Sequence, residues 1–235
     1  MLVAAAVCPT PPMLLPELAT GAAAELADAR TACSDALSVL TASRPDLLVV
    51  VGAADPDHLG AYPQGSRGTF RGFGAGADVR LGEGEEGPRL LPTSLSVGAW
   101  LLGRAGWGAA PLEGFGVAGP LDTGRCLETG RELAARDARV AMLVMGDGSA
   151  CRSLKAPGYL DERAAAFDAE AARALGAADL PALAALDAGL AAELQAAGRA
   201  PWQVLAGAAE GAGLEGRLLY EDAPYGVGYF VAAWS

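Results

Sequence analysis

A single histidine limits the chemistry available to this chain. His58 stands in the segment Asp55-Pro56-Asp57-His58, directly after an apolar run. One imidazole with carboxylates can bind a metal weakly, but these three groups crowd one loop instead of enclosing an ion. Two interpretations are therefore open: His58 is a residual metal ligand, or it is a solvated or hydrogen-bonded side chain of a polar loop.

A second group of polar side chains follows another apolar run. The segment MGDGSACRSLK contains Asp147, Ser149, Arg152 and Lys155, with Cys151 between them. These residues could form an anion or substrate pocket, because the glycines beside Asp147 let a ligand approach the backbone. Alternatively, Asp147 and Ser149 cap the segment that follows a turn. The candidate catalytic residues are Asp147, Ser149 and Cys151.

No nucleophile motif accompanies Ser149 or the cysteines. The residue two positions after Ser149 is not glycine, so the segment is not a G-x-S-x-G elbow. A Ser-His-Asp triad would need His58 to reach Ser149 across strand ends. Cys8 and Cys151 flank the presumed site as thiol nucleophiles or as small buried side chains. The four cysteines form no CxxC pair, which argues against a zinc ribbon or a thioredoxin-like centre.

Apolar runs and alanine-rich segments predict the elements that position these residues. We expect one α/β domain over residues 1–235: a twisted, largely parallel open sheet flanked by helices on both faces. The first strand, helix and second strand form a β-α-β unit with a right-handed crossover. Predicted strands are Leu2–Val7, Leu47–Val51, Ala77–Leu81, Gly114–Ala118, Arg139–Met145, Leu218–Glu221 and Gly228–Ala233. Predicted helices are Leu15–Ala42, Leu91–Ala105, Thr123–Arg136, Asp161–Leu175, Pro181–Ala197 and Pro201–Ala212.

Open α/β sheets bind ligands beyond the carboxyl ends of their strands. The loops Cys8–Pro12, Ala53–Gly60 and Gly146–Lys155 should therefore converge, with Asp222–Gly226 joining the last two strands. There Tyr225 lines the pocket as an aromatic wall or hydroxyl donor, or packs in a tight turn. The expected pocket-lining residues are Thr10, His58, Asp147, Ser149 and Tyr225.

The composition of the chain limits the classes of partner that we expect. Hydrophobic residues make up 52% of the 235 residues, and the formal net charge is −11. An acidic surface repels phosphate backbones and anionic lipids, so we expect neither nucleic acid nor membrane as a partner. The first residues, MLVAAAVCP, read as a strand instead of a signal peptide, and no apolar run reaches the ~18 residues of a membrane span. We expect a cytoplasmic protein.

Four segments resemble the class III extradiol ring-cleavage dioxygenases, in particular their LigB-like catalytic chains, and the related Memo proteins. VCPTPPMLLPEL is similar to the P-H-P-P…P-E signature, and RPDLLVVVG with DPDH to P-D-x-x-V-V-V…D-H. MGDGSACR stands where the family has G-G-x-S-H. LLYEDAPYGVGYFVAAW is similar to the ending of an actinobacterial branch.

The resemblance implies an Fe(II) centre with two histidines and one glutamate, and a further histidine as acid/base. Thr10 occupies the first ligand position and His58 the second. Ala150 occupies the acid/base position, and the glutamate would fall near Ala200–Trp202, where no acidic residue stands. Because His58 is the only histidine, no alignment supplies two imidazoles.

Three functional hypotheses follow. The first is a non-catalytic or repurposed dioxygenase-like protein, a pseudoenzyme that keeps a small-molecule cleft. The second is an active non-haem metal-dependent dioxygenase, or another enzyme using the same cleft. The third is a scaffold or interaction protein. We expect no cofactor, and Fe(II) or another divalent metal only if the degenerate site, through His58, still binds one. A small-molecule ligand and a homo-oligomer are the expected partners.

Overall fold

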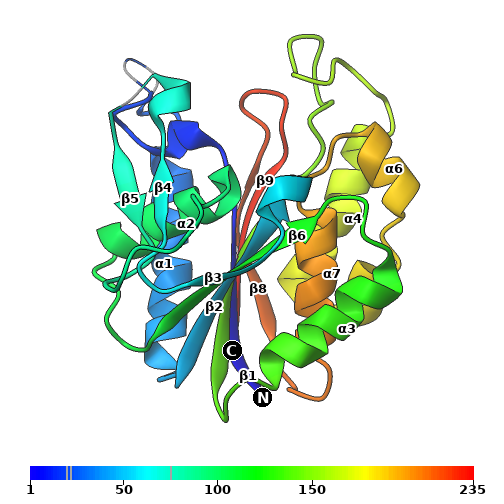
Figure 1. The fold of residues 1–235 in the computed structure, drawn as a ribbon. Coiled ribbons are helices and arrows are strands. Elements are labelled where there is room, and N and C mark those ends of the chain that lie inside the picture. Colours follow the sequence, from blue (N-terminus) through cyan, green and yellow to red (C-terminus); the bar gives the residue numbers. More distant parts are fainter. Residues whose placement is uncertain (20, 22, 75) are drawn as a thin grey trace.

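The computed structural model describes residues 1–19, 21, 23–74 and 76–235. Over these residues seven strands form one open sheet in the order β3-β6-β2-β7-β1-β9-β8 (Figure 1). Strands β6, β2, β7 and β1 are parallel, whereas β3 and β9 run antiparallel to their neighbours. The strands are β1 Leu2–Cys8, β2 Leu47–Ala54, β3 Gly60–Pro63, β6 Leu112–Ala118, β7 Val140–Met145, β8 Gly216–Asp222 and β9 Tyr229–Trp234.

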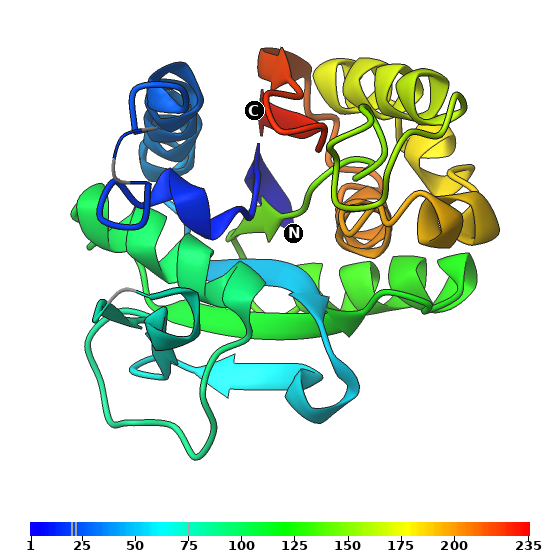
Figure 2. The same ribbon diagram turned by 90° about the horizontal axis from the view of Figure 1, so that it is seen from above.

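Helices cover both faces of the sheet, which gives two separate apolar cores. On one face lie α1 (Ala27–Ala42) and α2 (Thr93–Arg104). The opposite face carries the other helices, as the view from above shows (Figure 2). These are α3 Thr123–Ala134, α4 Ala164–Ala177, α5 Leu180–Ala184, α6 Ala188–Glu193 and α7 Arg199–Ala208.

The strands β1, β2 and β7 owe their central position to composition. Every residue of β7 is buried, as are most of β1 and β2, because apolar side chains must be covered on both faces. Their all-apolar sequences therefore correspond to the inner parallel strands. The predicted α/β class and largely parallel open sheet are confirmed.

A long excursion connects β2 with α2. It contains β3, β4 (Arg67–Thr69), β5 (Asp78–Arg80) and the 3₁₀ turns η2 (Pro56–His58) and η3 (Arg71–Phe73). Strands β4 and β5 form a separate two-stranded sheet. The sequence predicted a strand over Ala77–Leu81, but it did not predict β3 or β4, which are short and carry no apolar alternation.

Two helix predictions were wrong in their extent. The predicted helix Leu15–Ala42 includes residues 20 and 22, which lie outside the described part of the chain; of its described residues, only Ala27–Ala42 are α-helical. Pro16 and Gly21, with φ +98°, interrupt regular helix before that point. The predicted helix Pro181–Ala197 is split, because the Asp187 side chain accepts a hydrogen bond from the amide of Leu190 and starts α6 anew.

No helix within the described residues is long and apolar enough to cross a membrane.

Candidate functional site

The carboxyl ends of β1 and β7 place Thr10 beside Asp147. The parallel register pairs Cys8 with Met145, so Thr10 and Asp147 stand level two residues further on. The Thr10 amide donates to Oδ1 of Asp147 at 2.7 Å, and the Thr10 hydroxyl donates to Oδ2 at 2.5 Å. These two expected pocket residues therefore form one hydrogen-bonded pair.

Tyr229 is the first residue of β9, which pairs with β1 up to Val7 and Ala232. Beyond that pair the segment after β7 contacts the start of β9 directly, because the amide of Gly148 donates to the carbonyl of Gly228 and the amide of Gly228 donates to the carbonyl of Ser149. The Tyr229 side chain is 4% exposed. Burial raises its pKa, and the nearby charge of Asp147 raises it further. Asp147, Thr10 and Tyr229 thus lie at one edge of the sheet, where β7 and β1 end and β9 begins, and we refer to these three residues as the polar row.

Asp147 is a partly buried carboxyl group with a raised pKa. Burial raises the pKa of Asp147 to about 6, although the hydrogen bonds from Thr10 favour the ionised form and oppose that shift. The Asp147 carbonyl also accepts a hydrogen bond from the amide of Gly198 at 2.7 Å, just before α7. A carboxyl group with a pKa of about 6 can exchange a proton with a ligand that reaches it.

His58 lies far from this row. A Cβ atom on Gly116 of β6 would collide with the carbonyl of His58, so the histidine backbone stands over β6. Two strand spacings separate β6 from β7, after which Asp147 stands, and three separate β6 from β1, roughly 10 and 14 Å at about 4.8 Å per spacing. The segment is held there, because Tyr62 donates to the His58 carbonyl and the Arg89 guanidinium donates to the carbonyls of Leu59 and Ala61.

Ser149 belongs to a different network from Asp147. Its amide and hydroxyl donate to the two carboxylate oxygens of Asp168 in α4, at 2.7 and 2.8 Å. The guanidinium of Arg152 donates to the same carboxylate at 3.0 Å. Ser149 and Asp168 are fully buried. The predicted polar cluster is therefore divided, and Lys155 lies exposed outside both parts.

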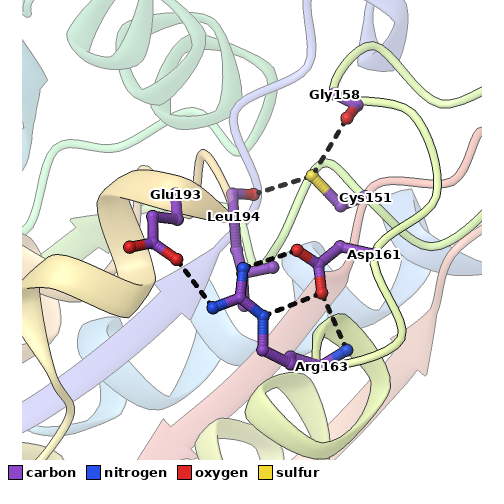
Figure 3. Close-up of polar contacts among 6 residues, drawn as sticks. All are labelled: Cys151, Gly158, Asp161, Arg163, Glu193 and Leu194. Atoms are coloured by element: carbon purple, nitrogen blue, oxygen red, sulfur yellow. Dashed lines mark hydrogen bonds and ion pairs between the residues drawn. The ribbon is translucent and has the colours of Figure 1, made fainter.

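Cys151 is enclosed by the loop that follows β7 (Figure 3). Its thiol is directed at the carbonyl oxygens of Gly158 and Leu194, each 3.5 Å from Sγ, and the residue is 2% exposed. Burial raises the pKa of the Cys151 thiol, and the charge of Asp161 raises it further. A buried thiol with a raised pKa carries little thiolate, the reactive form.

An ion-pair network fixes the outer part of the same loop (Figure 3). Arg163 donates to both carboxylate oxygens of Asp161, at 3.0 and 2.7 Å, and to Glu193 at 2.6 Å. The hydrogen bonds from Arg163 hold the pKa of Asp161 near 2. The ion pair of Arg163 with Glu193 therefore links the end of this loop, at the start of α4, to α6.

The residues at the positions where the resemblance implies an iron centre do not fit Fe(II). Thr10 already donates to Asp147, Ala150 has no ligand atom in its side chain, and Ala200–Trp202 offers no carboxylate. Beside that stretch, the guanidinium of Arg199 is 2% exposed and bonds to backbone carbonyls, so its positive charge opposes a bound cation. Among residues described by the structure, no three His, Cys, Asp or Glu side chains are grouped to hold a metal ion.

Tyr225 closes the row from the β8–β9 hairpin, which rises above the carboxyl end of the sheet in Figure 1. Its hydroxyl donates to Oε2 of Glu25, just before α1, at 2.9 Å. This contact joins residues 200 positions apart in the sequence. The Tyr225 hydroxyl is therefore used as a donor to Glu25, and its role in lining a pocket stays a prediction.

Three residues of this region were not predicted from the sequence: Asp168, Arg199 and Tyr229. Asp168 stands in an alanine-rich amphipathic segment, where a carboxylate is ordinarily solvated. Arg199 precedes a helix, where its sequence gives no sign of burial. For Tyr229 a signal existed, because it opens the apolar run of the last strand directly after the loop that contains the expected pocket residue Tyr225.

Comparisons with known proteins establish the fold and no more. No family model matches the chain, and no curated protein matches it. The crystal structure of an uncharacterized protein, JW3007 from Escherichia coli K12, is similar with a TM-score of 0.54 and 15% sequence identity, over 99% of each chain. The class defined by fold and site is therefore an α/β protein with a mixed, largely parallel seven-stranded sheet in its described residues and a polar row at the strand carboxyl ends.

Proposed function

We propose that this chain is a class III extradiol dioxygenase-like protein that has lost the Fe(II) site and keeps a small-molecule cleft at the strand carboxyl ends. One observation carries the proposal: Thr10, at the first ligand position of the resembling motif, is bonded to Asp147. The backbone of the lone His58 stands over β6, two strands away from β7, after which Asp147 follows. The protein is on this view non-catalytic or repurposed.

Metal analysis tests the proposal directly. The chain would be purified with Fe(II) under anaerobic conditions, and its iron content measured beside His58→Ala. We expect substoichiometric iron in both proteins and no oxygen-dependent ring opening of catechol, followed by absorbance. Stoichiometric iron that supports ring opening and is lost in His58→Ala would overturn the proposal.

A second candidate is an enzyme that uses Asp147 as a general acid or base. It is favoured by the pKa of about 6 and by the place of Asp147, a residue that is not fully buried, at the carboxyl end of β7. Ser149 and Cys151 support such an enzyme less, because both are buried and already bonded. A screen of small molecules for turnover by the wild type and by Asp147→Asn would test this hypothesis. An activity that the substitution abolishes supports a role of Asp147 as general acid or base.

The interaction hypothesis draws support from the loop after β7. Leu154, Tyr159 and Leu160 expose 62%, 62% and 45% of their surface. They belong to the loop whose end is linked to α6 by the ion pair of Arg163 with Glu193. Apolar side chains presented rigidly in this way suit a protein contact, and a homodimer is the simplest assembly. Light scattering would measure the oligomeric state of the intact chain and of a double variant that combines Leu154→Ser with Tyr159→Ser. A monomer in both cases argues against the interaction hypothesis.

A further inference from the structure

A cavity of about 350 Å³ lies between α1 and α2, which stand side by side on one face of the sheet (Figure 2). Its volume falls within the range of small-molecule sites, roughly 300–1,000 Å³. The lining side chains come from the first half of α1 and the end of α2: Arg30, Ser34, Leu37, Leu101, Arg104 and Ala105. None of the residues of the polar row lines it, so this cavity is separate from the site at the strand carboxyl ends.

The lining of the cavity combines apolar and cationic side chains. Leu37 and Leu101 are 2% and 3% exposed, so they form an apolar floor. Ser34 and Arg104 are exposed, and Arg30 is half-buried. A ligand that fits this lining therefore has an apolar part to cover the leucines and a polar group to meet the two guanidinium groups and the hydroxyl.

Arg30 is held in place and keeps spare donors. Its guanidinium donates to the carbonyl of Leu14 at 3.5 Å and to the carbonyl of Ala23. These bonds use two of the five N–H donors of a guanidinium. A donor whose position is already fixed loses little conformational freedom when a ligand binds, so Arg30 is preorganised for an acceptor in the cavity.

The positive charges of Arg30 and Arg104 have no neighbouring counter-charge. The guanidinium carbon of Arg104 lies 5.8 Å from the centre of the Trp100 ring. None of the ion pairs between described residues includes Arg30 or Arg104. Two guanidinium charges therefore line one cavity without a carboxylate to neutralise them.

The acidic residues of α1 belong to other faces of that helix. Arg30, Ser34 and Leu37 follow the spacing i, i+4, i+7 and share one face. Asp28 is two positions before Arg30, about 200° away around the helix. Asp35 lines a different cavity, beside β8, and α2 contains no acidic residue. The cavity is thus locally cationic in a chain whose net charge is −11.

The geometry points to a small phosphate monoester as the ligand of this cavity. Its phosphate oxygens accept hydrogen bonds from Arg30, Arg104 and Ser34, and its organic part covers Leu37 and Leu101. A monoester carries a charge of about −1.5 to −2 at neutral pH, which matches two guanidinium groups. Guanidinium groups bind phosphate through charge-assisted and often bidentate hydrogen bonds. The inference goes beyond the proposed function, because it concerns a second site.

Three probes separate the contributions of charge and of the organic part. Phenyl phosphate, phenyl sulfate and inorganic phosphate would be titrated into the intact chain at pH 8, with calorimetry and thermal stability as readouts. Phenyl sulfate has the same shape as phenyl phosphate but only one negative charge, and inorganic phosphate lacks the ring. We expect phenyl phosphate to bind about tenfold more tightly than either, since it alone has both features. Added NaCl should weaken its binding.

Matched variants locate the effect. Arg104→Gln removes one charge from an exposed side chain and should weaken phenyl phosphate binding about tenfold or more, because a hydrogen bond between charged groups is lost. Arg30→Gln should weaken it likewise. Arg217→Gln removes the same charge from an exposed position in β8 and should leave the affinity unchanged.

Three results would overturn the inference. The first is that none of the probes binds, and the second is that inorganic phosphate binds as tightly as phenyl phosphate. The third is an unchanged affinity for phenyl phosphate in Arg104→Gln with a lowered melting temperature. That result would show that Arg104 only compensates the carbonyl groups at the C-terminus of α2. Each of them leaves the proposed function untouched, because that function is tested by iron content and ring opening.

Discussion

Asp168 holds Ser149 by the same arrangement through which Asp147 holds Thr10. In each pair the amide and hydroxyl of one residue donate separately to the two oxygens of one carboxylate. The pairs differ in burial, because Asp168 is fully enclosed and Asp147 is not. One carboxylate is therefore suited to a structural role, and the other to meeting a ligand.

Removing the buried carboxylate should destabilise the fold strongly. In Asp168→Ala, the amide and hydroxyl of Ser149 and the Arg152 guanidinium lose their acceptor, and we expect the free energy of unfolding to fall by about 3–5 kcal/mol. Ser149→Ala should cost about 1 kcal/mol, because one hydrogen bond is lost. Chemical denaturation measures both, with Glu162→Ala, an exposed position, as the control near zero. Equal small losses in all three variants would contradict the structural role.

Asp147 should make stability depend on pH between about 4 and 6. Burial raises its pKa from 3.8 to about 6, so the folded state binds a proton more tightly than the unfolded state does. The free energy of unfolding from this group is therefore greatest at low pH and falls as pH rises through that window. Carboxyl groups with lowered pKa, such as Asp161, act in the opposite direction.

The contribution of Asp147 is isolated by comparison with Asp147→Asn. Relative to that variant, the wild type should lose on the order of 1–2 kcal/mol of stability between pH 4 and pH 7. Urea denaturation at several pH values measures the difference, and Asp57→Asn should show none of it. A difference that is constant with pH would mean that Asp147 has an ordinary pKa.

The cysteines should react slowly with thiol reagents in the native protein. All four are buried, and burial raises the pKa of the Cys151 thiol. We expect Ellman's reagent at pH 7 to modify them only as the protein opens, and to release four thiols per chain in guanidinium. A fast native thiol that disappears in Cys151→Ser would instead identify a reactive cysteine.

Arg89 should determine the order of the His58 segment. Its guanidinium donates to the carbonyls of Leu59 and Ala61 and lies 4.3 Å from the centre of the Tyr62 ring. In Arg89→Ala we expect faster amide hydrogen exchange in residues 57–61, since these carbonyls lose their shared donor. Arg104→Ala, which also removes an arginine stacked on a ring, should not change exchange there. Unchanged protection in Arg89→Ala would show that Tyr62 and β3 alone hold the segment.

The sequence was informative where one side chain or one local pattern decided the outcome. The apolar runs over Leu2–Val7 and Arg139–Met145 required burial on both faces, so they predicted inner parallel strands. The single histidine excluded a site with two imidazoles without any reference to geometry. Strand ends also predicted that the loops with Thr10 and Asp147 would meet.

Only the tertiary structure decided which polar groups pair and which remain free. Asp147 and Ser149 are two residues apart, yet strand register gives the first to Thr10 and helix packing gives the second to Asp168. His58 follows a strand that ends at the same edge of the sheet, but its backbone stands over β6, because the antiparallel β3 carries its segment to the sheet edge. Local sequence fixes the type of each element, whereas the contacts between side chains depend on how distant elements are set against one another, and those distances are defined only once the chain has folded.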